Sequence, residues 1–292
     1  MYSSATPILF RAITPVHAGS GRQLGIIDMP IQKESHTGIP KIEGASVKGC
    51  MREAYHRSNK KEDTNKLFGY ENGNDGAALI GFSDAKLLFY PIKSIHQLFT
   101  YITCPYLINR FLEDKSFSTG EEMKSILEDI KEGHVHLYTN NKDKLKDEKE
   151  IVLDVYDFKI DDVLEEIKLD QTTEKNDTQE ICTLYKKLGL KKDIAILSDT
   201  DFMEIIFLNR EIITRNRIDH ETGIVKDGGL FTEEYLPAES VLYSLLLVNG
   251  ILEGKEEENK KLVEDYQKKD IPKVLQIGGN KTIGKGIVKT VI

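Results

Sequence analysis

The sequence predicts an α+β fold. Short apolar runs rich in β-branched residues, which are typical of strands, recur along the whole chain. Segments with apolar residues at helical spacing lie among them, without the regular strand–helix alternation of a doubly wound sheet. Of the 292 residues, 39% are apolar and 30% charged, which is the ordinary composition of a globular protein with a large core.

The first part of the chain combines strands with a long loop and two helices. In the first helix, Ser46 is a candidate N-cap, and Val47, Met51 and Tyr55 lie at helical spacing. The predicted elements are a strand at 8–14, a glycine- and proline-rich loop at 15–30, a helix at 44–57, a strand pair or bent strand at 78–92, a strand at 99–103 and a helix from Pro105.

The later part begins with polar surface loops and ends with strands. In the extended segment 211–237, "ETG" and "KDGG" are the turn signals. The predicted elements are an amphipathic helix at 118–133, loops at 140–150 and 170–180, a strand at 193–197, a helix at 198–210, extended segments at 211–237, a strand at 240–250, a helix at 255–269 and two strands around a glycine-rich turn at 273–292.

The acidic charge is concentrated in one region. Residues 113–180 contain 21 acidic residues and 10 lysines, a net charge of −11, so the rest of the chain carries +3 of the total −8. We therefore predict a mildly basic body and a separate acidic insertion at 113–192, which acts as a lid or a contact surface. A basic body permits binding to RNA but does not demonstrate it.

The sequence gives no sign of membrane insertion or secretion. No run of about 18 apolar residues is present, and the first residues lack the pattern of a secretory signal. The three cysteines, Cys50, Cys104 and Cys182, are scattered and form no CxxC pair. These features favour a reducing cytoplasm.

Two basic segments could approach phosphate groups. "GGNKTIGKG" (278–286) is no nucleotide-binding loop, because Lys285 is followed by glycine and an apparent strand. It is either a plain hairpin turn or a turn whose backbone N–H groups meet a phosphate. Lys48 and Arg52 share one helix face, which could bind a phosphodiester backbone or simply face solvent.

The loop 14–35 contains a histidine and a carboxylate. His17 and Asp28 could form an acid–base pair or contact RNA, and a structural role is the commoner outcome for such a pair. No His or Asp signature indicates a tightly held metal. Arg215 and Arg217 share one strand face, where they could follow phosphates or pair with Glu233 and Glu234.

In order along the chain, several motifs together resemble the backbone RAMP subunits of the type III-B CRISPR effector, the Cmr complex. The motifs are "TPVHAGSGRQLGIIDMPIQKESHTGIPKIEGASVKGCMREAY", "LFG", "GFSDAKLLFYPI", "TYITCPYLINRF", "TRNRIDHETGIVKDGGLFTEEYLP" and "LQIGGNKTIGKG". The resemblance covers nearly all of the chain outside the acidic insertion. It departs from the family at Phe231, where we expect a larger aromatic residue.

The resemblance implies a single RAMP domain at 1–292 with a modified ferredoxin-like (RRM-like) core and a helical insertion. A β-hairpin thumb at 209–237 would flip bases at regular intervals. Copies of the subunit would line up along a CRISPR RNA, together with other Cmr subunits, and cleave a complementary single-stranded target RNA. The expected products are a cyclic phosphate and a 5′-OH.

The resemblance also implies roles for single residues. Asp28, in the loop 14–35, would be the catalytic residue and would bind Mg²⁺ loosely, since the ion and the RNA phosphate assemble only on the guide–target duplex. His17, Glu234 and Tyr235 are further catalytic candidates. The RNA-binding candidates are Ser20, Lys48, Arg52, Arg215, Arg217, Gly279, Lys281 and Lys285.

Three alternatives remain open at this point. The chain could be a purely structural guide-binding subunit, with cleavage performed by another subunit. It could be the related type III-A backbone subunit, although "DMPIQ" and "CPYLINRF" favour type III-B. A stand-alone metal nuclease is the least favoured, because the sequence shows no clustered acidic site that would hold its metal.

Overall fold

The structure is a computed structural model that describes residues 2–22, 25–58, 60–70, 76–119, 127–139, 148–164, 177–249 and 256–292. The chain divides into two compact units. Unit 1 comprises Met1–Leu87 and Arg210–Thr290 with Ile292, and unit 2 comprises Leu88–Asn209 with Val291. No described helix is long and apolar enough to cross a bilayer.

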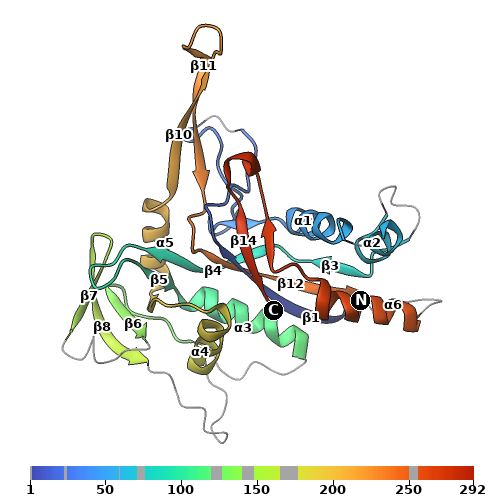
Figure 1. Cartoon of the computed structure of the whole chain (residues 1–292). Helices are drawn as coiled ribbons and strands as arrows, with labels where there is room; N and C mark the ends of the chain where they lie inside the picture. The colour runs from blue at the N-terminus through green and yellow to red at the C-terminus, as the bar shows by residue number, and fades with distance from the viewer. Residues whose placement is uncertain are drawn as a thin grey trace, which may run out of the picture. The chain divides into compact units, whose positions relative to one another are not determined.

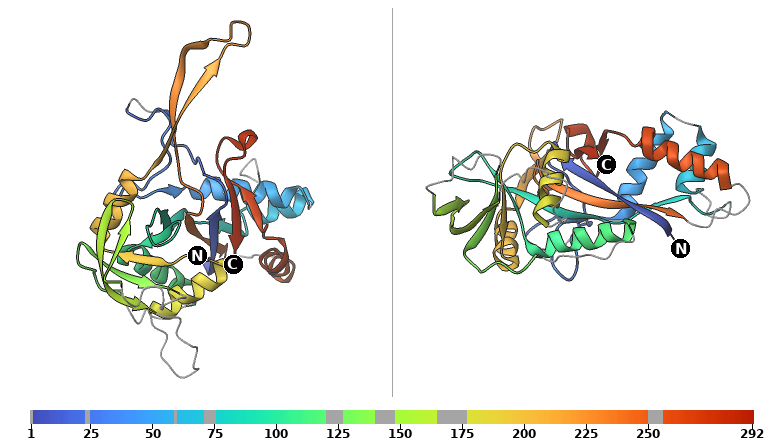
Figure 2. Two further views of the ribbon diagram at one scale, coloured as in Figure 1. Left: turned by 60° about the vertical axis from the view of Figure 1, so that its left-hand side comes forward. Right: turned by 90° about the horizontal axis from the view of Figure 1, so that it is seen from below.

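Unit 1 contains a sheet in which β13, β14, β1 and β12 are neighbours, in that order. Helix α1 packs against β3 and β13, and α2 packs against α6 (Figures 1 and 2). The elements are β1 (Tyr2–Ala12), β2 (Lys41–Ile42), α1 (Gly44–His56), α2 (Lys61–Phe68), β3 (Ile80–Phe82), β10 (Glu211–Ile218), β11 (Val225–Tyr235), β12 (Val241–Asn249), α6 (Glu256–Asp265), a π-helical turn (Tyr266–Asp270), β13 (Val274–Gln276), a 3₁₀ turn (Lys281–Ile283) and β14 (Ile287–Val291).

Strands β1 and β12 form the centre of unit 1. They pair antiparallel from Tyr2 opposite Asn249 to Arg11 opposite Val241. β12 is buried along nearly its whole length, which explains its continuous apolar sequence. The helix face of Val47, Met51 and Tyr55 is buried as predicted.

Unit 2 contains a sheet with the order β4-β5-β9-β6-β8-β7, in which β4 begins in unit 1. The β5–β9 and β6–β8 pairs are parallel, and the others are antiparallel. The elements are β4 (Ala85–Ile92), β5 (Thr100–Thr103), α3 (Pro105–Thr119), β6 (His134–Tyr138), β7 (Glu150–Leu153), β8 (Tyr156–Leu164), α4 (Asp177–Leu188), β9 (Ile194–Leu197) and α5 (Asp199–Leu208).

Hairpin β10–β11 forms a two-stranded sheet of its own. It extends beyond the other strands of unit 1 (Figure 1). Its turn is closed at Asp219, whose backbone N–H donates to Ile224 O and whose carboxylate accepts from the N–H of Thr222. Extended segments therefore lie where the sequence predicts them, and the role of a thumb remains a prediction.

Three local predictions were wrong. "KDGG" forms no turn but lies inside β11, where the register against β10 is interrupted and Gly228 has a φ of 64°. Ser46 does not cap α1, because the helix begins at Gly44. The predicted helix at 118–133 is not helical over 127–133, and 120–126 lie outside the described residues.

The acidic segment 113–192 is only partly helical. Besides α4 and the end of α3, it contributes β6, β7 and β8 to the sheet of unit 2. The loops predicted at 140–150 and 170–180 fall mostly outside the described residues. The boundaries of the insertion and its role as a lid or contact surface remain predictions.

Candidate functional site

The loop 14–35 is hydrogen-bonded along both of its arms to the base of hairpin β10–β11, within unit 1. Val16 and Leu236 exchange two backbone hydrogen bonds of 2.8 and 2.9 Å. On the other arm, Met29 donates to Thr232 O and accepts from the N–H of Glu234, each at 3.0 Å. This backbone pairing fixes the loop against β11 on each side of its tip.

Asp28 is an exposed carboxylate that strand β11 orients. Its Oδ2 accepts from the backbone N–H of Thr232 at 2.7 Å and from the Thr232 hydroxyl at 2.9 Å. These two hydrogen bonds, with a smaller contribution from the charge of Arg22, lower the pKa of Asp28. No described residue hydrogen-bonds to Oδ1, so an ionised carboxylate presents one oxygen to solvent.

The apolar neighbours of Asp28 do not surround it. Ile26 is 97% exposed, so the loop tip is open to solvent. We expected the partner of Asp28 to be a bound ion and an RNA phosphate, and the structure adds Thr232 as a partner within the chain.

His17 is buried and serves the packing of the site. Its Nδ1 lies 2.8 Å from the backbone oxygen of Glu234. Since a carbonyl can only accept, Nδ1 carries the proton. The ring lies 5.4 Å from that of Tyr235, and a Cβ at Gly19 would lie 2.8 Å from Nε2. These contacts favour the structural reading of His17, and its catalytic role remains a prediction.

Glu233, rather than Glu234, joins Tyr235 in a network. Glu233 Oε2 accepts from the Tyr235 hydroxyl at 2.6 Å, from Arg215 at 2.8 Å and from Asn280 at 3.2 Å. Burial alone would raise the pKa of Glu233, but these hydrogen bonds outweigh it and lower the pKa. Burial and the Glu233 carboxylate raise the pKa of Tyr235 to about 12, so its hydroxyl is a donor at neutral pH.

Glu234 lies on the opposite face of β11 and is fully buried. Lys33 Nζ lies 2.7 Å from its Oε1, and the backbone N–H of Ile31 donates to Oε2 at 3.2 Å. These contacts fix the outgoing arm of the loop to β11. The geometry favours a positioning role for Glu234, and its catalytic role stays a prediction.

The basic residues near the hairpin differ in their contacts within the chain. Arg215 is committed to the Glu233 network. Arg217 is exposed, with its guanidinium 5.5 Å from the Phe231 ring, and Lys285 Nζ lies 4.6 Å from the Tyr235 ring. Arg217 is therefore better placed than Arg215 to meet a phosphate.

On helix α1 the two predicted contacts also differ. The Lys48 side chain is half-buried, and burial, together with the charge of Arg52, lowers its pKa. Arg52 donates to the Gly69 carbonyl and, at 2.8 Å, to Asn65 Oδ1. Arg52 thus fastens α1 to the C-terminal end of α2.

The glycine-rich loop 278–286 lies against both α1 and the loop 14–35. Gly279 donates its N–H to His17 O at 2.8 Å. Burial raises the pKa of the Cys50 thiol in α1, and the nearby backbone N–H of Gly278 and charge of Lys281 partly oppose that rise. The exposed Lys281 is therefore brought close to the helix that carries Lys48.

Two predictions remain to be placed: the RNA contact at Ser20 and the metal site at Asp28. Ser20 is exposed, and its hydroxyl donates to Pro30 O at 3.2 Å. For metals, the described residues contain no group of three or more His, Cys, Asp or Glu side chains that could hold an ion. Among the described residues of the site, Asp28 is the one that would supply a metal ligand, through Oδ1.

The sequence comparison identifies the family. A sequence model described as the RAMP superfamily matches residues 9–289. The chain belongs to the RAMP superfamily. Within it, the chain is 34% identical over 289 residues to a Pyrococcus furiosus protein described as CRISPR system Cmr endoribonuclease Cmr4, covering 96% of this chain and 92% of the relative. Membership of the Cmr4 family follows from that identity and coverage.

Solved structures confirm the RAMP fold. The crystal structure of oligomeric Cmr4 from Pyrococcus furiosus superposes with a TM-score of 0.73 and 26% identity, covering 99% of this chain and 98% of that one. A chain of the type III-B Cmr-beta complex bound to cognate target RNA gives a TM-score of 0.75 at 23% identity, covering 99% and 97%. The predicted α+β fold with a ferredoxin-like RAMP core is confirmed.

Sequence reasoning missed three residues of the site: Thr232, Asn280 and, as a partner of Tyr235, Glu233. Thr232 has no local signal, because it lies 204 residues from Asp28. Asn280 stands inside the glycine-rich motif at a φ of 61°, a conformation that asparagine tolerates. An asparagine inside a glycine-rich motif, where positive φ is common, was the one sequence feature that could have pointed to Asn280.

Proposed function

We propose that this chain is a backbone subunit of a type III-B CRISPR effector complex that binds a CRISPR RNA and cleaves the complementary target RNA. The single observation that carries the proposal is Asp28, an ionised and exposed carboxylate that Thr232 orients in a member of the Cmr4 family. The Pyrococcus relative is described as an endoribonuclease.

The proposed reaction is attack by a 2′-OH of the target RNA on the adjacent phosphate. The bond from phosphorus to the 5′-oxygen breaks, leaving a cyclic phosphate and a 5′-OH. Asp28 would hold a divalent ion, best Mg²⁺, through Oδ1. Such an ion supplies charge stabilisation at the phosphate and keeps most of its waters when one carboxylate binds it.

Other residues of the chain hold the Asp28 carboxylate ionised and in a fixed orientation. The hydrogen bonds from Thr232 keep Asp28 ionised and fix its orientation before RNA arrives. Glu234 and Lys33 secure the outgoing arm of the loop, while Glu233 and Tyr235 brace the hairpin base.

We assign the guide-binding surface to the part of unit 1 around α1 and the glycine-rich loop. Lys48, Lys281 and the backbone of Gly279 would contact phosphates, with Ser20, Arg217 and Lys285 as further contacts. Arg52 and Arg215 would support this surface through their contacts within the chain. Hairpin β10–β11 would act as the thumb.

The partners in this proposal are the guide, the target RNA, further copies of the chain and other Cmr subunits. The proposed location is the cytoplasm. The three cysteines are free thiols, as a reducing compartment requires.

A purely structural guide-binding subunit is the second candidate. The observation that favours it is that His17, Glu234 and Tyr235, three of the four predicted catalytic side chains, are buried. Under this reading another subunit would cut the target, and Asp28 would be dispensable.

The test is guide-dependent cleavage by the reconstituted complex. The complex is assembled with a guide and offered a complementary RNA, a non-complementary RNA, or the complementary RNA with EDTA. We expect metal-dependent cutting of the complementary RNA only, with products ending in a cyclic phosphate. Cutting by the free chain without a guide would instead indicate a stand-alone nuclease.

A further inference from the structure

Gln32 uses both ends of its side-chain amide to join separate segments of unit 1. It lies on the outgoing arm of the loop, four positions after Asp28. Its Nε2 donates to Gly19 O at 3.2 Å, on the incoming arm, and its Oε1 accepts from the N–H of Glu43 at 2.8 Å, immediately before α1. One side chain therefore connects both arms of the loop to the start of the helix.

The backbone of Gln32 makes the same connections. Its N–H donates to Ala18 O at 2.7 Å, and its carbonyl accepts from the N–H of Lys41 at 3.0 Å. The preceding residue, Ile31, donates to Glu234 Oε2. Two consecutive residues thus bind the loop to β11 on one side and to the approach to α1 on the other.

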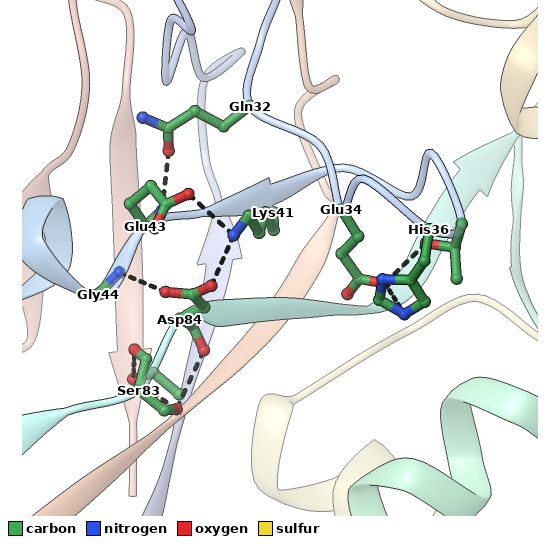
Figure 3. Close-up of polar contacts among 10 residues, drawn as sticks. Gln32, Glu34, His36, Lys41, Glu43, Gly44, Ser83 and Asp84 are labelled. Carbon is green, nitrogen blue, oxygen red and sulfur yellow. Dashed lines mark hydrogen bonds and ion pairs between the residues drawn. The ribbon is translucent and has the colours of Figure 1, made fainter.

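The start of α1 is held by residues outside the helix (Figure 3). Glu43 occupies the N-cap position without a side-chain capping bond. Asp84, in the turn between β3 and β4, accepts from the N–H of Gly44 at 2.8 Å and contacts Lys41 Nζ at 2.7 Å. Lys41 in turn lies 2.8 Å from Glu43 Oε1. Gln32 therefore binds to a first turn that this cluster has already fixed.

We propose that Gln32 is a positioning residue that couples the placement of Asp28 to helix α1. This inference rests on the proposed function, because α1 carries the guide contact Lys48 and the loop carries Asp28. Gln32 acts through the loop and not on the RNA. The amide suits this role, because it has a donor at one end for Gly19 and an acceptor at the other for Glu43 without carrying a charge.

Two substitutions separate these contributions. Gln32→Leu keeps most of the volume and removes both hydrogen bonds. Gln32→Glu keeps the acceptor for Glu43 but turns an oxygen toward the Gly19 carbonyl, where two acceptors repel each other. The matched control is Gln97→Leu in unit 2, since the Gln97 side chain also makes two hydrogen bonds, both from Nε2, to Thr100 at 2.9 Å and to Asp193 at 3.1 Å.

The experiment measures single-turnover cleavage at saturating target in the assembled complex, beside the Kd for target and the Tm. We expect both Gln32 variants to cleave at least about tenfold more slowly, because small misplacements of a catalytic group are costly. The Kd should stay within about threefold, a change below 1 kcal/mol in binding. Gln97→Leu should change only the Tm. In an Asp28→Asn background, Gln32→Leu should slow any residual cleavage no further.

A second readout does not depend on activity. In hydrogen exchange of the free chain, Gln32→Leu should speed exchange in residues 25–33 and 43–47 and leave β12 protected as in wild type. Wild-type cleavage in Gln32→Leu, or unchanged exchange in those segments, would overturn the positioning role. If Asp28→Ala cut normally, the proposed function would fail instead, while the exchange result would still decide whether Gln32 fixes the loop.

Discussion

Thr232 donates two hydrogen bonds to a single oxygen of Asp28, from its backbone N–H at 2.7 Å and from its hydroxyl at 2.9 Å. The two residues are 204 positions apart in the chain. Strand β11, far from the loop in sequence, therefore orients the Asp28 carboxylate. The hairpin and the candidate catalytic residue form one structural element.

Thr232→Val should impair cleavage with little effect on folding. Valine keeps the shape and the backbone N–H but removes the hydroxyl, so the Asp28 carboxylate keeps one of its two hydrogen bonds and the Asp28 N–H loses its acceptor. We expect cleavage to slow by about tenfold or more, because a catalytic group out of place loses rate steeply. Single-turnover rates in the assembled complex provide the measurement.

The same variant should change the pH dependence. The hydroxyl of Thr232 lowers the pKa of Asp28, so its removal raises that pKa toward the ordinary value of 3.8. The acidic limb of the pH–rate profile should therefore move to higher pH. Thr214→Val, at the position opposite Thr232 on β10, is the control. Equal loss in both variants would show that the hairpin, not the Asp28 contact, is responsible.

Glu233→Gln should destabilise the chain at neutral pH and make its stability less sensitive to acid. Hydrogen bonds from Arg215, Tyr235 and Asn280 lower the pKa of Glu233 below its ordinary 4.5. The stability that this carboxylate contributes is present above about pH 4.5 and is lost as the pH falls through the lowered pKa. We expect a loss of about 1–3 kcal/mol at pH 7, since Arg215 keeps only part of its hydrogen bonding.

The measurement for Glu233→Gln is denaturant unfolding at pH 7 and again near pH 4. The difference in free energy of unfolding between variant and wild type should shrink at the lower pH. A difference that stays constant with pH would mean that the charge of Glu233 contributes nothing.

Gly278→Ala should disrupt the contact between the glycine-rich loop and the loop 14–35. Gly278 has a φ of 83°, and an added Cβ would collide with the His17 carbonyl. Gly284→Ala is the matched control, because its φ of 76° is equally unfavourable but its surroundings are open. We expect the control to cost about 1 kcal/mol in stability and Gly278→Ala clearly more, measured by thermal unfolding. Equal losses would indicate that backbone strain alone matters.

Lys48→Gln and Lys281→Gln should weaken guide binding without unfolding the chain. Each lysine that neutralises a phosphate contributes about one unit to the salt dependence of binding, so each variant should reduce that slope by about 0.7 to 1. Arg52→Met should instead lower the Tm, because Arg52 donates to Gly69 and Asn65. Guide affinity measured over a range of salt concentrations separates the two cases. A full salt slope in Lys48→Gln would exclude a phosphate contact at that residue.

Much of the fold could be predicted from the sequence, because most of its signals are local. The apolar runs of β12 and β9 and the helical spacing in α1 lie where the pattern places them, while β1 starts six residues before the strand predicted at 8–14. Predictions failed where a hydrogen bond expected from a neighbouring residue is made by a residue distant in the sequence. Ser46 was expected to cap α1, but Asp84 accepts from its first N–H. The glycines of "KDGG" suit a turn equally well as an interruption inside β11.

The site could be predicted only in outline. The resemblance pointed to Asp28, yet the residue that orients it comes from a strand 204 positions away. Which of the adjacent residues Glu233 and Glu234 contacts Tyr235 depends on the face of β11 that each occupies. That face is set by the register of the hairpin. Only the folded chain shows that Glu233 joins Tyr235 and that Glu234 joins Lys33.

The most direct test of the account is the rate of target RNA cleavage by the assembled complex carrying Asp28→Ala, beside wild type in Mg²⁺. Guide occupancy and target affinity are measured on the same preparations. We predict that the variant assembles and binds target like wild type but leaves it uncut. Cleavage at the wild-type rate would contradict the account and leave this chain as the scaffold of the complex.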